Sequence, residues 1–406
     1  MNDTTKRHQI PDDWLPHVHE IWTSGDRNNA IKTVVNELNF ITEKKPKCLL
    51  LQLAFYLFLS KNFLSASTVF KNALAEYPDD KEILLNTVIS LSRAEQHKEA
   101  ITYATQLLRT DPQNDIGWDC ITKSYHAVND KERASRAGTN SLLIKDSKSG
   151  EENPKWKLPS SSIDDFIGKK KKVISFSLWG NHQRYIFGAL RNLLLAPDLY
   201  PDWEIWIYLD NSVPEPFIDI FKHLGATILL QTNPKTEREK LCWRFKVANH
   251  PDIGYFMVRD IDSVFSLREV NAVQQWLDSD KWFHIIRDYW THTDLILAGL
   301  WGGVAGVLPN LQQLLTKYQP DIVDTPNIDQ WFLRDCIWRY VKTSCMIHDR
   351  CFRQKGSIPL PGPEPKGNIH VGSNEFAQRP DFQKNILSPW IGGGNIPQSS
   401  YISSTH

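Results

Sequence analysis

Hydrophobic positions recur with two different periods along this chain, and the change of period divides it into two parts. From about residue 47 to residue 146, apolar side chains lie three or four positions apart, as in amphipathic helices. From residue 173 onward, short apolar runs alternate with helical patterns, which predicts an α/β domain with a mainly parallel sheet. We therefore expect a helical part at 1–148, a linker rich in Ser, Pro, Gly and charge at 149–172, an α/β domain at 173–376 and an irregular tail at 377–406.

The helical part contains an internal repeat. Ala66, Ala100 and Ala134 lie 34 residues apart, and so do Pro78 and Pro112. A period of 34 built from two helices is the spacing of the tetratricopeptide repeat (TPR), so we expect a TPR-like helical solenoid. Such a solenoid offers a concave surface for a protein partner or a second copy, and it can equally serve as a stabilising scaffold.

The second domain shows six apolar runs that read as strands, at 173–178, 203–209, 225–230, 254–258, 282–286 and 341–347. Helical patterns separate them at 184–195, which Pro197 should end, and at 216–224, 237–248 and 266–278. Another helix should begin near Asn327. Neither a dinucleotide-binding glycine motif nor a P-loop is present.

The fourth run is followed by two carboxylates, in the sequence GYFMVRDIDSVFS at 254–266. Asp260 and Asp262 are two residues apart and, in extended backbone, would point to the same side at the carboxyl end of a buried strand. Such a D-x-D sequence is often only a solvated turn. The apolar residues on both sides favour a site in which a hard divalent cation, Mn²⁺ or Mg²⁺, lies between the carboxylates and holds a diphosphate.

A glycine-rich stretch, LAGLWGG, follows at 297–303. Glycines this dense beside tryptophan indicate either backbone packed against a ligand or a tight structural turn. Three polar residues at a helix start come next, Asn327, Asp329 and Gln330, and capping accounts for only one of them.

Composition excludes several classes of protein. Lys plus Arg and Asp plus Glu number 47 each, so nothing indicates a general nucleic-acid binder. The six cysteines have no paired spacing, which suits a reducing compartment. No signal peptide is visible, and no apolar run is long enough to span a bilayer. The expected location is cytoplasmic.

The ordered set of motifs resembles GT-A-fold nucleotide-sugar glycosyltransferases, in particular a bacterial and viral group of such enzymes. The matching residues read R-D-x-D-S at 259–263, H-x-x-R-D at 284–288, G-x-W-G at 299–302, D-Q at 329–330 and H-D at 348–349. The resemblance covers about 173–375 and implies a GT-A-like (Rossmann-like) α/β glycosyltransferase domain.

The resemblance also implies roles for particular residues. Asp260 and Asp262 would hold Mn²⁺ or Mg²⁺ against the diphosphate of a nucleotide-sugar donor, a UDP-sugar first of all, with His348 or His370 as a later ligand. His348 is favoured because it directly follows a predicted strand. The other expected roles are phosphate contacts by Arg259 and Arg287, donor binding by Gln330, and a sugar pocket lined by Gly299, Trp301 and Gly302. Asp288 and Asp329 are expected to contact sugar or acceptor hydroxyls, and one of them would act as base if the enzyme inverts.

Three functions remain open from the sequence. The favoured one is a metal-dependent glycosyltransferase acting on a glycan or protein acceptor, with the helical part recruiting the acceptor, a partner or a second copy. The second is a scaffold protein whose second domain binds a sugar nucleotide but does not catalyse its reaction. The third, a metal-dependent hydrolase or phosphatase, would need more clustered His and Asp than the chain shows.

Overall fold

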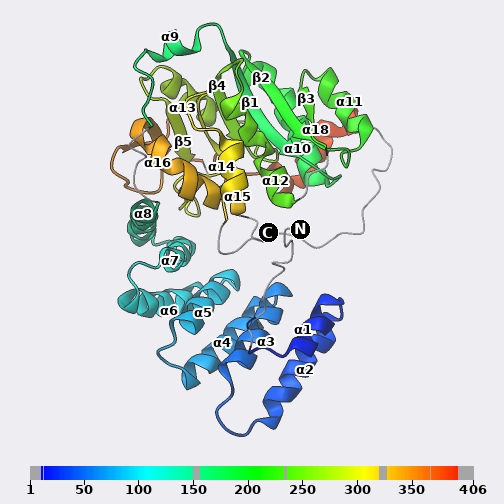
Figure 1. Ribbon diagram of the computed structural model, residues 1–406, viewed down its shortest axis with the longest axis vertical. Helices are drawn as coiled ribbons and strands as arrows, with labels where there is room; N and C mark the ends of the chain where they lie inside the picture. The colour runs from blue at the N-terminus through cyan, green and yellow to red at the C-terminus, as the bar shows by residue number, and fades with distance from the viewer. Residues whose placement is uncertain are drawn as a thin grey trace. The chain divides into compact units, whose positions relative to one another are not determined.

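The computed structural model describes residues 11, 13–149, 156–232, 236–319, 327–365 and 367–391. The chain forms two compact units, Met1–Ile144 and Lys145–His406. Figure 1 draws the helical unit in blue to teal and the α/β unit in green to red. In the described residues, no helix combines the length and the apolar character needed to cross a membrane.

The first unit consists of helices that follow one another in antiparallel pairs (Figure 1). They are α1 (Pro16–Thr23), α2 (Arg27–Phe40), α3 (Lys47–Leu59), α4 (Phe63–Glu76), α5 (Lys81–Arg93), α6 (His97–Thr110), α7 (Asp115–Ala127) and α8 (Lys131–Lys148), whose last residues belong to the second unit.

The sequence period of 34 residues is also a structural period, so the expected helical repeat is confirmed. Helices α3, α5 and α7 begin 34 residues apart, as do α4, α6 and α8. The alanines that defined the period are fully buried, where paired helices approach closely. In each of the three pairs from α3 to α8, the turn contains one non-glycine residue with a left-handed backbone: Lys61 at φ 61°, Glu95 at φ 59° and Asn129 at φ 62°.

The second unit is built on one sheet of eight strands in the order β3-β2-β1-β4-β6-β5-β7-β8. Every neighbouring pair is parallel except those that involve β6, which runs antiparallel to β4 and β5. The strands are β1 (Lys171–Leu178), β2 (Trp203–Leu209), β3 (Thr227–Leu230), β4 (Ile253–Arg259), β5 (Phe283–Arg287), β6 (Leu300–Val304), β7 (Cys345–Asp349) and β8 (Ser357–Ile358). The mainly parallel α/β sheet expected from the apolar runs is therefore present.

Helices connect these strands, as the alternating pattern predicts. They are α9 (Ile163–Ile167), α10 (Gln183–Leu199), α11 (Glu215–His223), α12 (Glu237–Cys242), η1 (Trp243–Asn249), α13 (Leu267–Leu277), α14 (Leu311–Lys317), α15 (Ile328–Phe332), η2 (Leu333–Ile337), α16 (Trp338–Val341), η3 (Lys342–Ser344), α17 (Glu375–Gln378) and α18 (Pro380–Ile391).

Two expectations about element ends are wrong. Pro197 does not end α10, which continues to Leu199, because a proline in the last turn disrupts little of the helix that precedes it. The tail expected to be irregular from 377 contains α18, which packs on α10. The ion pair between Arg191 of α10 and Glu375 of α17, at 2.6 Å, fixes this C-terminal segment to the domain.

The glycine-rich stretch forms β6, which the sequence reading missed. A Cβ at Gly302 would lie 2.5 Å from the carbonyl oxygen of Phe256, and one at Gly303 would lie 2.6 Å from the Phe283 ring. Gly302 and Gly303 therefore allow β6 to fit between β4 and β5, which explains structurally why these two positions are glycine.

The repeated left-handed turn yields a stability prediction. At φ 59°, Glu95 carries a side chain in a backbone conformation that costs about 1–2 kcal/mol in any residue except glycine and, to a lesser degree, asparagine. We expect Glu95→Gly to unfold at higher urea concentration than Glu95→Ala, by about 1 kcal/mol in the free energy of unfolding, measured by circular dichroism. Both variants remove the same carboxylate, so equal stabilities would contradict the backbone explanation.

Candidate functional site

The candidate site lies where the strand order of the sheet reverses. From β1 the chain adds β2 and then β3 on one side, and β4 then joins the opposite side of β1. Loops that leave β1 and β4 at their carboxyl ends therefore diverge and open a crevice, which is where open α/β sheets bind ligands. Asp260 and Asp262 follow β4 at this point.

The D-x-D segment forms a tight turn rather than the extended backbone expected from the sequence. The Ser263 amide donates to the Asp260 carbonyl at 3.0 Å, which reverses the chain directly after β4. The two carboxylates differ in exposure: the Asp260 side chain is 52% exposed and that of Asp262 is 10% exposed. Asp260 is thus open to a ligand, whereas Asp262 is held inside.

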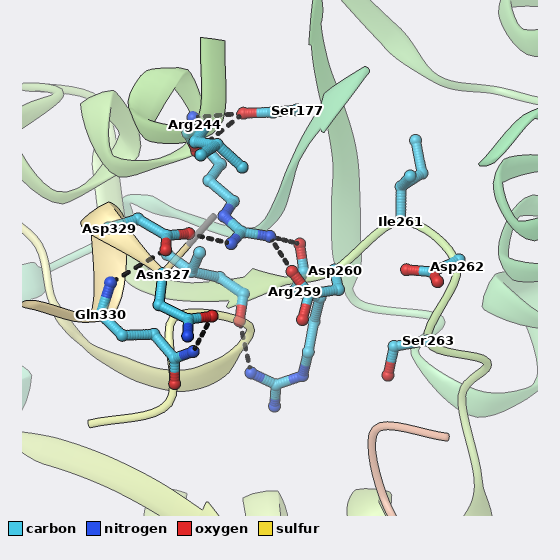
Figure 2. Close-up of polar contacts among 12 residues, drawn as sticks. Ser177, Arg244, Arg259, Asp260, Ile261, Asp262, Ser263, Asn327, Asp329 and Gln330 are labelled. Carbon is cyan, nitrogen blue, oxygen red and sulfur yellow. Dashed lines mark hydrogen bonds and ion pairs between the residues drawn. The ribbon is translucent and has the colours of Figure 1, made fainter. Parts of the chain in front are cut away.

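Arg244 joins Asp260 to Asp329. Figure 2 shows its guanidinium between the two carboxylates, with Nη1 bonded to Asp260 and Nη2 donating to Asp329 Oδ2 at 2.9 Å. Ser175 and Ser177 of β1 hold the Arg244 backbone, through hydrogen bonds of 2.8 and 3.0 Å to its carbonyl and amide. The buried Arg244 thereby brings together two aspartates that the sequence placed in separate motifs.

Asp262 is paired with a second arginine. Arg184 lies in the first turn of α10, and its Nε donates to Asp262 Oδ2 at 2.5 Å. Burial raises the pKa of Asp262 above its usual value, the Arg184 charge opposes this, and the charge of Asp260 raises the pKa further. Burial likewise raises the pKa of Asp329, with Arg244 opposing. Three carboxylates and two guanidiniums leave the cluster with one formal negative charge.

Two glycines let the backbone and side chains of this loop approach one another. A Cβ at Gly299 would lie 2.2 Å from Asp260 Oδ2, and a Cβ at Gly188 would lie 2.5 Å from the Asp262 Cα. Gly299 therefore makes room for the Asp260 carboxylate. Gly188 allows α10 to pack directly on the D-x-D turn.

Gln330 leaves an acceptor without a partner beside the cluster. Its amide nitrogen faces Asn327 Oδ1 at 3.5 Å, and its backbone amide donates to Asp329 Oδ1 at 2.9 Å (Figure 2). Its Oε1 is buried and has no hydrogen-bond partner in the described residues. A buried amide oxygen of this kind is stabilised by a hydroxyl or N–H donor from a ligand or water.

Arg259 and Arg287, the expected phosphate contacts, are buried. Arg259 is 1% exposed and forms an ion pair with the equally buried Glu269. Arg287 donates to the carbonyls of Asp294 and Leu295 and to Gln354 Oε1, at 2.6 to 2.9 Å. In this arrangement neither guanidinium presents a donor to a phosphate.

Trp301 and Gly302 lie inside β6, whose residues are all buried. The Trp301 ring is 1% exposed and packs edge-on against Phe256 and close to Phe245. Of the three residues expected to line a sugar pocket, Gly299 alone touches the acidic cluster, through Asp260.

Asp288 lies at the carboxyl end of β5 and is separate from the Arg244 cluster in its contacts. It is fully buried, accepts from the Val371 amide at 2.9 Å and forms ion pairs with Arg350 at 2.7 Å and Arg268 at 3.4 Å. Two guanidiniums therefore hold this carboxylate in place.

The two candidate histidines occupy different environments. His348 is fully buried, and its ring nitrogens lie 2.8 Å from His284 Nε2 and 2.8 Å from Gln275 Oε1, so both are engaged. His370 belongs to a segment that runs beside the D-x-D turn, where Ser263 bridges to Asn374 and the Val264 amide donates to the Ser373 carbonyl. The structure thus places the segment of His370, rather than His348, beside the acidic loop.

Sequence reasoning missed Arg184, Arg244 and Gly188. Nothing in the local sequence distinguishes the two arginines from solvated helix residues, since their partners lie 78 and 16 positions away along the chain. Gly188 carried a usable signal, because a glycine inside a helix destabilises it and so indicates close packing against another segment.

Comparisons with known proteins add little to this geometry. No protein-family model matches the chain, and no curated protein matches it. A MamA structure from Desulfovibrio magneticus RS-1 aligns with 32% of this chain and 72% of its own, at 16% identity and a TM-score of 0.29. An O-GlcNAc transferase mutant from Thermobaculum terrenum aligns with 60% of this chain and 44% of its own, at 18% identity and a TM-score of 0.35. Likenesses this weak identify neither a family nor a function.

The contact between Gly299 and Asp260 can be tested by a double-mutant cycle. Gly299→Ala should lower the free energy of unfolding by about 1–3 kcal/mol, because the new Cβ collides with the Asp260 carboxylate. The same substitution in an Asp260→Ala background should cost at least about 0.5 kcal/mol less, measured by urea denaturation. Equal costs in the two backgrounds would show that the carboxylate does not lie against Gly299.

Proposed function

We propose that this chain is a glycosyltransferase that takes a sugar from a nucleotide-sugar donor, first of all a UDP-sugar, and transfers it to a glycan or protein acceptor. The observation that carries the proposal is the cluster of Asp260, Asp262 and Asp329 with two arginines at the switch point of the sheet. Nucleotides bind at this position in open α/β folds. The cluster retains a formal negative charge, so an anionic diphosphate would bind there together with a cation.

The donor set fits a divalent ion that arrives with the diphosphate. The described residues contain no group of three or more His, Cys, Asp or Glu arranged around a metal position. Mg²⁺, however, is commonly bound through one or two carboxylates plus substrate phosphates and water. Asp260, the half-exposed carboxylate, would hold Mg²⁺ or Mn²⁺ in that way, Asp262 would join it by exchanging Arg184 for the ion, and His370 is a further candidate ligand. When bound, the ion supplies positive charge that offsets the charge growing on the leaving diphosphate.

The donor sugar would lie between the diphosphate and the start of α15. Gln330 Oε1 offers an unused acceptor to a sugar hydroxyl, and the two carboxylate oxygens of the adjacent Asp329 are held by Arg244 and by the Gln330 backbone amide. Arg244 fixes Asp329 relative to Asp260. The residues that would contact the sugar therefore stay at a constant distance from those that would hold the diphosphate. Such positioning before the reaction is a major source of catalytic rate.

Asp329 is the better of the two proposed acidic residues for the reacting centre. It shares Arg244 with the D-x-D segment, whereas Asp288 is enclosed by Arg268, Arg350 and the Val371 amide. If the reaction inverts the anomeric centre, the raised pKa of Asp329 also suits a general base better than an unperturbed carboxylate.

The helical unit would recruit the acceptor, a carrier protein or a second copy of the chain. Solenoids of stacked helix pairs present extended surfaces to protein partners. This unit carries large apolar side chains in the open, including Phe40 at 83% exposed and Leu64 at 57% exposed. An interaction role for the unit is therefore part of the proposal.

The proposal predicts release of nucleoside diphosphate from a sugar donor. The full-length protein, incubated with UDP-sugars and Mn²⁺ in the absence of acceptor, should release UDP slowly by donor hydrolysis. Asp260→Asn should lower that rate by roughly 100-fold or more, because it removes the carboxylate that would hold the divalent ion against the diphosphate. Asp252→Asn is the matched control, since Asp252 is exposed, lies just before β4 and has no contact with the cluster.

Two results would count against the proposal. The first is a folded wild-type protein that releases no nucleotide from UDP-, GDP- or CMP-sugars, as expected for a scaffold that binds without turnover. The second is an equal loss of rate in Asp260→Asn and Asp252→Asn, which would disconnect the activity from the acidic loop.

A further inference from the structure

Three residues of α10 contact the D-x-D turn from one side of the helix. Arg184, Gly188 and Asn192 follow one another at intervals of four positions, so they share a face of α10. Gly188 packs its backbone on the backbone of the turn. Asn192 is buried, and its side-chain nitrogen donates to two backbone carbonyls of the turn at 3.1 and 3.0 Å. The helix and the backbone of the turn are therefore fixed to each other.

The Arg184 side chain is the exposed member of this set. It is 28% exposed and lies in the first turn of α10, where its guanidinium also lies over the Tyr185 ring, 5.4 Å from the ring centroid. Its Nε donates to Asp262 Oδ2, but in the part of the chain that the structure describes its terminal nitrogens Nη1 and Nη2 donate to no acceptor. These terminal N–H groups can therefore bind a ligand.

Arg184 occupies the position that a cation bound to Asp262 would take. The Asp262 side chain is only 10% exposed, and Arg184 is its one ion-pair partner among the described residues. A carboxylate this deeply buried needs a compensating charge, which Arg184 supplies. A divalent ion at the same carboxylate would repel the guanidinium, so the two cations compete for Asp262.

A diphosphate would give the displaced guanidinium a new partner. Guanidinium groups pair with phosphates through two parallel hydrogen bonds, and the terminal nitrogens of Arg184 are available for such a pair. Because α10 is fixed to the turn, Arg184 stays beside the site after it leaves Asp262. The lost ion pair is therefore replaced when the ion and the diphosphate are both present, and not when the ion binds alone.

We propose that Arg184 stands in for the divalent ion at Asp262 and moves to the diphosphate of the nucleotide when the ion binds. The ion alone must break the pair between Arg184 and Asp262, so it binds weakly. The ion and the nucleotide together bind cooperatively, because each favours the same position of Arg184. That the nucleotide is a sugar donor rests on the proposed function, whereas the exchange requires only a divalent ion and a diphosphate.

The exchange predicts effects of opposite sign from one substitution in the full-length protein, with Mn²⁺ and UDP as probes. Arg184→Gln removes the competing charge, so Mn²⁺ alone should bind about fivefold or more tightly, measured from the electron paramagnetic resonance signal of free Mn²⁺. The same variant lacks the phosphate contact, so UDP at saturating Mn²⁺ should bind about tenfold or more weakly, measured by calorimetry. Loss of a merely structural contact would not strengthen Mn²⁺ binding.

Two further variants serve as controls. Arg184→Lys keeps a positive charge for Asp262 but cannot form the paired contact, so Mn²⁺ alone should bind within about threefold of wild type and UDP at saturating Mn²⁺ at least about threefold more weakly. Lys171→Gln removes the same charge from an exposed ion pair with Glu204, at the opposite end of β1 from the site. It should change either affinity by less than about threefold.

Failure of this inference is distinguishable from failure of the proposed function. Mn²⁺ binding that is unchanged or weaker in Arg184→Gln, UDP binding at saturating Mn²⁺ that is unchanged, or equal effects of Arg184→Gln and Lys171→Gln would each overturn the inference. These results leave UDP release by the wild type unaffected. Conversely, a protein that shows both shifts but releases no nucleotide from a sugar donor would retain the exchange and lose the transferase. A wild type that binds neither Mn²⁺ nor UDP would contradict both.

Discussion

The buried guanidinium of Arg244 is the contact on which the candidate site depends. It holds the carboxylates of Asp260 and Asp329, which reach the switch point from β4 and α15 and would otherwise repel each other. Removing one member of a buried ion pair costs about 3–5 kcal/mol, because the partner charge is left without compensation. Arg244 in turn depends on β1, whose Ser175 and Ser177 bond its backbone. The charge cluster therefore depends on the position of β1 in the sheet.

The net negative charge of this cluster determines which kind of ion it attracts. A fully neutralised set of ion pairs would be only a structural feature, whereas one uncompensated carboxylate at a half-exposed position favours a cation. An anionic diphosphate alone would be repelled.

The parts of this structure that depend on local sequence could be predicted, and those that depend on distant contacts could not. Helical periodicity and repeated alanines predicted the 34-residue repeat, and five of the six expected strands overlap observed strands over most of their length. The strand expected from residue 341 begins at Cys345, because the helical turns of α16 and η3 occupy its first residues. Strand β6 was missed because its glycines are explained only by the neighbours they approach, Phe256 and Phe283.

The candidate site shows the same limit. The sequence predicted roles for Asp260, Asp262 and Asp329, and the resemblance to glycosyltransferases implied phosphate contacts for Arg259 and Arg287. The structure directs both of these arginines into the interior, while Arg184 and Arg244 arrive from other elements to pair with the aspartates. These ion pairs form because the fold brings distant elements together, so the spacing of motifs along the sequence does not reveal them.

The most direct measurement is a calorimetric titration of UDP into the protein with and without Mn²⁺, repeated with an Asp260→Asn/Asp262→Asn variant. If the acidic turn binds a divalent ion together with the diphosphate, Mn²⁺ should strengthen UDP binding by about tenfold or more in the wild type, and the variant should lose that gain. UDP affinity that is the same with and without Mn²⁺, and the same in the variant, would contradict the account.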